Sequence, residues 1–126
     1  MEQVTYAVRG NRAEWAGRSL RDWVPDLVAA MVDNFDPVKI LLFGSVADDT
    51  DGPDSDIDLL VVLDEAALTQ RRRLMVDLRH ASRDIAAPHD LLVTSIDDFE
   101  RNQNSAGTAE FEPAHHGVVV YERSTA

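Results

Sequence analysis

The sequence predicts an α/β (α+β) fold, in which helices pack on a small mixed β-sheet. Short apolar runs of the kind found in buried strands cover residues 38–43, 56–63, 90–94 and 117–121. Segments with helical spacing of apolar residues separate them, and such alternation favours helices layered on one sheet. A chain of 126 residues is the size of one domain with a single core.

The main domain is predicted over residues 19–126. The preceding residues 1–18 are predicted as an N-terminal arm or a short strand. Val4, Tyr6 and Val8 alternate with polar or small residues, which is typical of a strand. Gly10-Asn11 then indicates a turn.

The first helix is predicted over residues 20–35, where apolar side chains recur at helical spacing: Leu20, Val24, Leu27, Met31 and Phe35. Asp22 is expected to cap this helix, which places Pro25 in the first turn, where its missing N–H costs nothing. Asp36-Pro37 is expected to end it.

Three further helical segments are predicted in the second half of the chain. Asp64 is expected to cap a helix that reaches about Asp84. Ser95 followed by Asp98 resembles a capping box for a helix ending near residue 103. An interrupted helical stretch is expected over residues 105–115, weakened by Pro113.

The segment from Leu41 to Leu63 carries the strongest functional signal. One apolar run ends at Gly44-Ser45, and ten residues later Asp56-Ile57-Asp58 opens another. On a strand, Asp56 and Asp58 would project from the same face. Two adjacent carboxylates repel each other unless a cation lies between them, and Mg²⁺ suits such a place. Gly44 and Ser45 offer close backbone approach and a hydroxyl for a phosphate.

Composition narrows the range of partners. The net charge of −11 argues against duplex nucleic acid, since phosphate neutralisation needs clustered basic residues. With no cysteine, a disulfide framework and a thiol nucleophile are excluded. No apolar run approaches the roughly 20 residues of a membrane span, and the N-terminus does not resemble a secretory signal. A cytoplasmic protein without membrane partners is therefore expected.

The motifs together resemble the minimal nucleotidyltransferases (MNT type) of the DNA-polymerase-β-like superfamily. The resemblance rests on Gly44-Ser45, Asp56-Ile57-Asp58 and a later Asp90 that opens another apolar strand, and it covers about residues 37–122. It implies two Mg²⁺ ions held by Asp56, Asp58 and Asp90. It also implies that Gly44 and Ser45 contact the nucleotide phosphates.

The resemblance further implies a reaction and a partner. A nucleoside triphosphate, ATP by similarity, would donate AMP to an acceptor hydroxyl and release pyrophosphate. Asp90 is also a candidate base for the acceptor proton. The acceptor would lie on a small all-helical protein of the HEPN type, for which this chain would act as the antitoxin.

Two alternatives stay open. The family commonly follows Gly-Ser-x-Ala with Arg-Gly, whereas this chain has Asp48-Asp49, so a cation near the phosphates is replaced by anions. A catalytically weak module that neutralises its partner by binding alone is the first alternative. A stand-alone transferase acting on a small molecule is the second.

Other polar residues are given structural interpretations. The acids at 48, 49, 51 and 54 are expected to be solvated turn residues. A calcium loop is rejected because its register places Ala47 at the first ligand position. The histidines lack zinc-ligand spacing. A basic helix face is expected to be solvated, with docking of an acidic or helical partner as the alternative: Arg71, Arg72, Arg73, Arg79 and Arg83.

Overall fold

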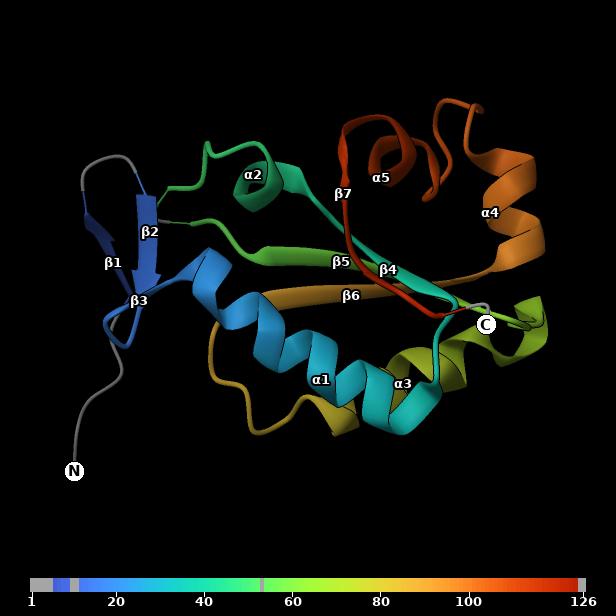
Figure 1. Ribbon diagram of the computed structural model, residues 1–126, viewed down its shortest axis with the longest axis horizontal. Coiled ribbons are helices and arrows are strands. Elements are labelled where there is room, and N and C mark those ends of the chain that lie inside the picture. The colour runs from blue at the N-terminus through green and yellow to red at the C-terminus, as the bar shows by residue number, and fades with distance from the viewer. Residues whose placement is uncertain (1–5, 10–11, 53, 125–126) are drawn as a thin grey trace.

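A four-stranded mixed sheet forms the centre of the molecule (Figure 1). The computed structural model describes residues 6–9, 12–52 and 54–124. The strand order is β6-β5-β4-β7, where β4 is Lys39–Phe43, β5 is Ile57–Leu63, β6 is His89–Ser95 and β7 is Val118–Glu122. β5 and β6 are parallel, and β4 is antiparallel to both of its neighbours. The predicted fold class is confirmed.

Two helices, α1 (Val24–Phe35) and α3 (Arg71–Ala81), cover one face of the sheet. Their apolar stripes meet alternate side chains of β4 and β5, which point to the same face because strand side chains have period two. Burial of each large apolar side chain stabilises the fold by roughly 1.5–3 kcal/mol. The fully buried members of this core include Leu27, Met31, Ile40, Leu42, Ile57, Leu59, Val61 and Leu78.

A smaller apolar cluster lies on the opposite face. Phe99 of α4 (Ile96–Asn102) packs there against Leu41, Leu60 and Val62, and α5 (Phe111–His116) also borders this cluster. The alternation that directs Leu60 to this face also directs Asp58 to it. This second face is therefore the one on which the polar residues at the strand beginnings gather.

The first predicted helix is divided into two. A 3₁₀ turn, η1 (Leu20–Trp23), precedes α1. The predicted cap Asp22 is wrong. Ser19 caps η1, since its Oγ accepts the Asp22 N–H at 3.2 Å, and the residue before α1 is Trp23, which makes no side-chain cap bond. Pro25 lies in the first turn of α1 as predicted. The helix ends at Phe35 and is followed by Asp36, whose φ of 46° is left-handed.

The predicted cap at Asp64 is also wrong. Asp64 instead pairs with Arg123, whose guanidinium donates to both carboxylate oxygens at 2.8 and 2.9 Å. This hydrogen-bonded pair lowers the pKa of Asp64. A short 3₁₀ turn, η2 (Leu68–Gln70), leads into α3, which is therefore shorter at both ends than the periodicity indicated.

The last two helix predictions have different outcomes. Ser95 Oγ accepts the Asp98 N–H at 3.1 Å, so Ser95 caps α4 as predicted. α5 begins at Phe111 rather than near residue 105. Pro113 lies in its first turn, where a missing N–H is tolerated, so the proline helps to define where this helix starts.

The N-terminal residues form a small sheet of their own. β1 (Tyr6–Arg9) pairs antiparallel with β2 (Arg12–Trp15), which pairs with β3 (Arg18–Ser19). The predicted strand around Tyr6 and Val8 is thus present, while Val4 and the predicted turn at Gly10-Asn11 lie outside the described residues. Trp23 Nε1 donates to the Trp15 carbonyl at 3.0 Å and joins this sheet to η1.

Candidate functional site

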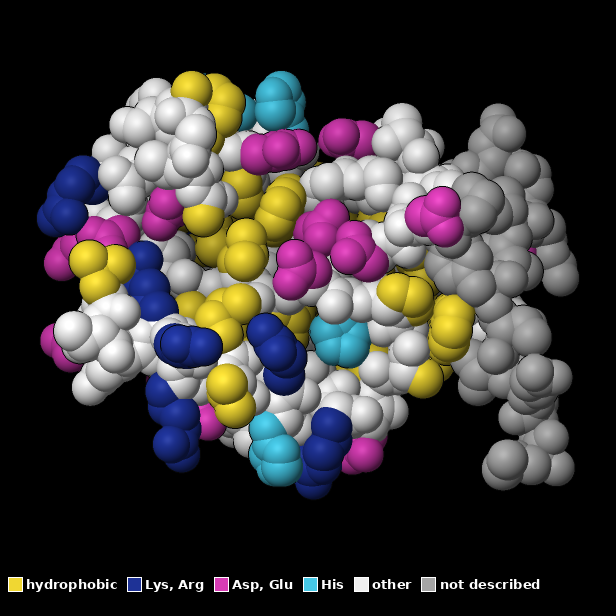
Figure 2. Space-filling model, turned by 180° about the vertical axis from the view of Figure 1, so that it is seen from behind, with side chains coloured by type: hydrophobic (Ala, Val, Ile, Leu, Met, Phe, Trp, Pro, Cys, Tyr) yellow, Lys and Arg dark blue, Asp and Glu magenta, His cyan; other side chains and the backbone are white. Residues whose placement is uncertain are grey.

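Asp58 and Asp90 are direct neighbours on parallel strands. Asp58 of β5 is the register partner of Asp90 of β6, and Phe43 at the end of β4 lies across from Asp58 on the other side. Register partners in a sheet project to the same face, so the two carboxylates share it. Acidic side chains gather near the middle of this side of the molecule in Figure 2. Asp58 is half-buried, whereas Asp90 is exposed.

Asp56 completes the acidic group. It precedes β5 by one residue, and its carboxyl group lies near enough to that of Asp58 to raise the Asp58 pKa. The pKa of Asp58 is raised to about 7, first by burial, then by the charge and hydrogen bond of Asp56, and further by Asp90 and Glu112. The part of this shift that comes from neighbouring carboxylates reflects a negative potential at Asp58, which a bound cation would relieve.

At Gly44 the backbone lies in direct contact with this acidic group. It has a φ of 76°, which favours glycine, and a Cβ atom at this position would collide with Asp58 Oδ2. Gly44 begins the short helix α2 (Gly44–Ala47), directly after β4. Ser45 follows, and its hydroxyl donates to Ser55 Oγ at 3.0 Å, while Ser55 Oγ also accepts the Gly52 N–H at 2.8 Å.

The chain therefore brings the predicted Gly44, Asp56, Asp58 and Asp90 to one place, with Ser45 next in sequence. Two contributors were not predicted. Ser55 holds the Ser45 hydroxyl, and Glu112 contributes negative charge from α5. No local pattern indicates Glu112, because it lies far from Asp58 in sequence on a short helix.

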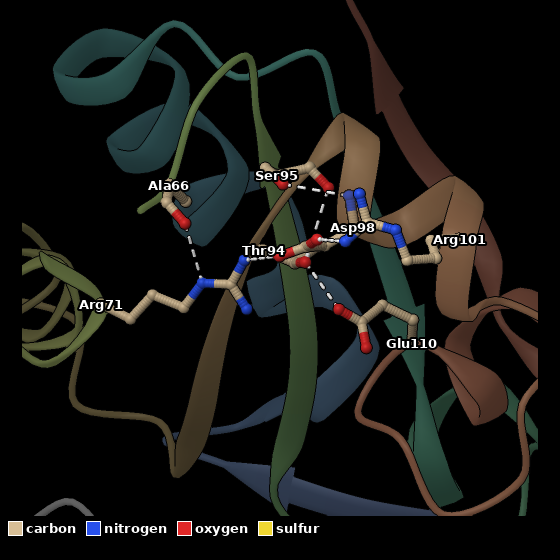
Figure 3. A network of polar contacts seen from close by, with 7 residues as sticks. All are labelled: Ala66, Arg71, Thr94, Ser95, Asp98, Arg101 and Glu110. Atoms are coloured by element: carbon tan, nitrogen blue, oxygen red, sulfur yellow. Dashed lines mark hydrogen bonds and ion pairs between the residues drawn. The ribbon is translucent and has the colours of Figure 1, made fainter. Parts of the chain in front are cut away.

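A buried polar network fixes the elements behind the site (Figure 3). Thr94 Oγ1 donates to Glu110 Oε2 at 2.6 Å, and both residues are buried. Glu110 is the residue before α5, so this bond ties that helix to β6. Arg71 donates to the Ala66 carbonyl at 2.9 Å and forms an ion pair with Asp98. Arg71 is thus a structural residue and not part of a solvated face.

The sequence comparison decides the family. The profile described as "Polymerase beta, Nucleotidyltransferase" matches residues 26–126, which is most of the chain. The chain belongs to the polymerase beta nucleotidyltransferase family. Nucleotidyl transfer is the general activity of this family.

Solved structures agree with this family at the level of the fold. One similar structure is a protein from Sulfolobus solfataricus, provisionally named a nucleotidyltransferase, with a TM-score of 0.55 and 20% identity. The match covers 82% of this chain and 81% of that protein. A comparison with curated proteins gave no match. None of the helices in the described residues is long and apolar enough to span a membrane.

The carboxylates of this nucleotidyltransferase domain have the chemistry of a Mg²⁺ site. Mg²⁺ is commonly held by one or two carboxylates together with substrate phosphates, and Asp56 with Asp58 offers such a pair. Among the described residues, no three His, Asp or Glu side chains converge closely enough to hold one ion together. Two carboxylates together with a substrate phosphate are therefore the ligand set that these residues could offer to one ion.

The acidic loop that follows α2 is not uniformly solvated. Asp48 and Asp54 are exposed as predicted, but Asp51 is only 1% exposed, and its Oδ2 accepts the Ala13 N–H at 2.7 Å. Asp49 forms an ion pair with Arg21 at 3.2 Å. The prediction of a solvated turn residue is therefore wrong for Asp51.

His89 is occupied by structural contacts next to Asp90. Its Nδ1 lies 2.7 Å from the Ala87 carbonyl oxygen and its Nε2 lies 3.0 Å from Ser82 Oγ. These contacts fix the start of β6. His115 stacks on Phe111, with ring centroids 4.3 Å apart, on the outer side of α5.

Proposed function

We propose that this chain is a Mg²⁺- and ATP-dependent nucleotidyltransferase that transfers AMP to an acceptor hydroxyl. The observation that carries the proposal is the register of Asp58 with Asp90, combined with the contact between Gly44 and Asp58. In this arrangement two acidic side chains and the Gly44 backbone lie next to one another. The family match over residues 26–126 supports nucleotidyl transfer as the reaction class.

In the proposed reaction the acceptor oxygen attacks the α-phosphorus of ATP. A bond forms between that oxygen and phosphorus, the bond to the bridging oxygen breaks, and pyrophosphate leaves with its electron pair. The acceptor proton must move to a nearby base. Asp90 is the proposed base, because it is exposed and adjacent to Asp58, within reach of an acceptor on this face.

Asp56, Asp58 and Asp90 are the proposed ligands of two Mg²⁺ ions. When bound, such ions stabilise the attacking and leaving oxygens of an in-line displacement. The residues of the chain supply the carboxylate oxygens and hold them at the starts of two neighbouring strands. Gly44 and Ser45 are the proposed contacts for the triphosphate, through the backbone and the hydroxyl.

The proposed acceptor lies on a small helical protein of the HEPN type, with this chain as its antitoxin. The family resemblance supports this partner, and two apolar features of the surface are candidates for its contact. An open apolar groove lies between α1 and the sheet, bordered by Val28, Val32 and Val120. On the edge strand β7, Val118 and Val119 are 44% and 50% exposed. Consecutive strand residues point to opposite faces, so these two valines expose apolar surface on both sides of the sheet edge, and exposed apolar surface often marks protein interfaces.

Labelled ATP tests the activity directly. Transfer of label from α-³²P-ATP to a co-expressed partner should require Mg²⁺, and Asp58→Ala should reduce it by more than about 100-fold. Asp84→Ala, at an exposed position beyond α3, is the matched control and should transfer label like the wild type. Undiminished transfer by Asp58→Ala would place the chemistry elsewhere.

A second candidate function is a module that neutralises its partner by binding alone. The exposed acidic Asp48 beside the candidate phosphate site favours it, because negative charge there opposes a triphosphate. In that case the partner would co-purify with both the wild type and Asp58→Ala, and no label would be transferred by either. Retained neutralisation by Asp58→Ala in cells would support this second function.

A further inference from the structure

We propose that the N-terminal sheet and η1 act as a clamp that positions the loop of residues 44–55. This phosphate loop carries Gly44 and Ser45, so the clamp would orient the proposed phosphate contacts. Only the nucleotide-binding part of this inference rests on the proposed function. Its structural part, that residues 13 and 21 hold the loop, stands on contacts within the chain.

The first contact is buried. Asp51 is 1% exposed, Ala13 is fully buried, and the Asp51 Oδ2 atom accepts the Ala13 N–H at 2.7 Å. A carboxylate is rarely buried unless its oxygens are well satisfied, so a loop residue with this burial must be tightly held. In Figure 1 the loop between α2 and β5 runs to the side of β2. The small sheet is thus joined to the phosphate loop across 38 residues of sequence.

The second contact acts on α2 itself. Arg21 Nη2 donates to the Val46 carbonyl at 2.9 Å, to the Ala47 carbonyl at 3.2 Å and to Asp49 Oδ1 at 3.2 Å. A cation is favourable at the carbonyl end of a helix. Arg21 therefore holds the C-terminal end of α2, opposite to Gly44. Because Arg21 belongs to η1, which follows the N-terminal sheet, the position of that sheet determines where Arg21 holds α2.

Hydrogen bonds within the loop connect the residues held by the clamp to Ser45. The Thr50 N–H donates to the Ser45 carbonyl at 2.9 Å, and the Gly52 N–H donates to Ser55 Oγ at 2.8 Å. Ser55 Oγ in turn accepts a hydrogen bond from the Ser45 hydroxyl. Because Asp51 lies between Thr50 and Gly52, loss of its anchor should loosen both bonds. Asp51 and Arg21 are thus positioning residues and not catalytic ones.

The clamp lies outside the segment that matches the family. Ala13 and Arg21 precede residue 26, where the match begins. Ala13 and Arg21 therefore come from a segment to which the comparison assigns no role. The proposed role for residues 12–23 is to compensate for a phosphate loop that is rich in acidic residues and would otherwise repel itself.

Hydrogen exchange of the full chain tests the clamp without any nucleotide. In Asp51→Ala and in Arg21→Gln, amide protection at Thr50 and Gly52 should fall by at least about 10-fold, since local opening becomes easier. Arg21→Gln alters a side chain that is 43% exposed, so this variant should fold even if Asp51→Ala does not. Leu78→Ala is the control, because it destabilises the α3 core away from the loop.

Nucleotide binding gives the second readout. The dissociation constant for Mg²⁺-ATP should rise about 3- to 10-fold in both anchor variants and stay at the wild-type value in Leu78→Ala, measured well below each melting temperature. Unchanged protection in both anchor variants, or an equal loss in Leu78→Ala, would overturn the clamp. If protection falls as expected but the wild type binds no ATP, the clamp stands and the proposed function fails.

Discussion

Gly44 and Asp58 lie so close together that no side chain can be added between them. A Cβ atom at Gly44 would collide with Asp58 Oδ2, and the φ of Gly44 is 76°. This contact joins the end of β4 to the second residue of β5, which are adjacent antiparallel strands. The backbone proposed to meet the phosphates is therefore fixed against the carboxylate proposed to bind the metal.

Gly44→Ala should consequently damage the site more than the fold. Positive φ costs an L-residue roughly 1–2 kcal/mol, and the collision should additionally displace the Asp58 carboxylate. Gly107→Ala is a matched control, since Gly107 has a φ of 89° but no atom within 4 Å of an added Cβ. Both variants should lose similar stability in urea, but only Gly44→Ala should lose Mg²⁺-ATP binding in calorimetry. Equal binding by the two variants would contradict the proposed role of this contact.

The raised pKa of Asp58 predicts a stability that falls as pH rises. Its pKa is about 7 in the folded chain against 3.8 for the free side chain, so the folded state keeps a proton that the unfolded state releases. The resulting stabilisation is complete below about pH 4 and is lost as the pH passes through about 7.

Asp58→Asn should remove this dependence. At pH 8 the variant should be more stable than the wild type by about 1–2 kcal/mol, a value reduced for solvent screening of a half-buried group. Near pH 4 the two proteins should differ little. Urea denaturation at several pH values in the presence of EDTA measures this, and parallel curves for the two proteins would contradict the assignment.

Cation binding should relieve the same repulsion. Mg²⁺ or Mn²⁺ should raise the melting temperature of the wild type at pH 8, more strongly with ATP present, because a ligand of the folded state stabilises it. The double variant Asp56→Asn, Asp58→Asn should show no such rise and no binding heat. The same heats from this variant and from the wild type would exclude these two residues as the metal site.

Sequence periodicity predicted the strands and, with them, the position of Asp56 and Asp58 at the beginning of β5. Asp58 and Asp90 each begin an apolar run, and strand beginnings that are parallel neighbours bring such residues together. Gly44 could be predicted for the same reason, since it directly follows the preceding strand. Local patterns alone indicate Gly44, Asp56 and Asp58, whereas the choice of Asp90 depends on the resemblance to the minimal nucleotidyltransferases.

Long-range contacts could not be predicted in this way. The burial of Asp51 depends on the Ala13 N–H, which a distant strand supplies. Asp64 was expected to cap a helix because it stands before one, but Arg123 from the far end of the chain competes successfully for its carboxylate. In both cases a tertiary partner replaced the local role that aspartate usually has in turns and caps.

The buried bond between Thr94 and Glu110 should be important for stability. Thr94→Val would leave the buried Glu110 carboxyl without its donor at 2.6 Å, which should cost about 1–3 kcal/mol. Thr108→Val is a suitable control, because the Thr108 hydroxyl donates to the Asn102 and Ser105 carbonyls in a partly exposed turn. Denaturation in urea should separate the two variants by at least about 1 kcal/mol, and equal stability would contradict the assigned role.

Charge reversal at Asp48 tests whether the acidic loop weakens nucleotide binding. Asp49 is already paired with Arg21, whereas Asp48 is exposed, so Asp48 is the better position for the test. A carboxylate near the triphosphate in a partly solvated loop should cost roughly 1 kcal/mol or less. Asp48→Arg should therefore tighten ATP binding several-fold at low salt, and the gain should shrink as salt screens the charges.

Asp84→Arg makes the same change in net charge at an exposed position beyond α3, and should have little effect. Dissociation constants measured at two ionic strengths decide the question. If Asp48→Arg changes neither value, the loop serves solubility alone and its acidic residues have no influence on the nucleotide.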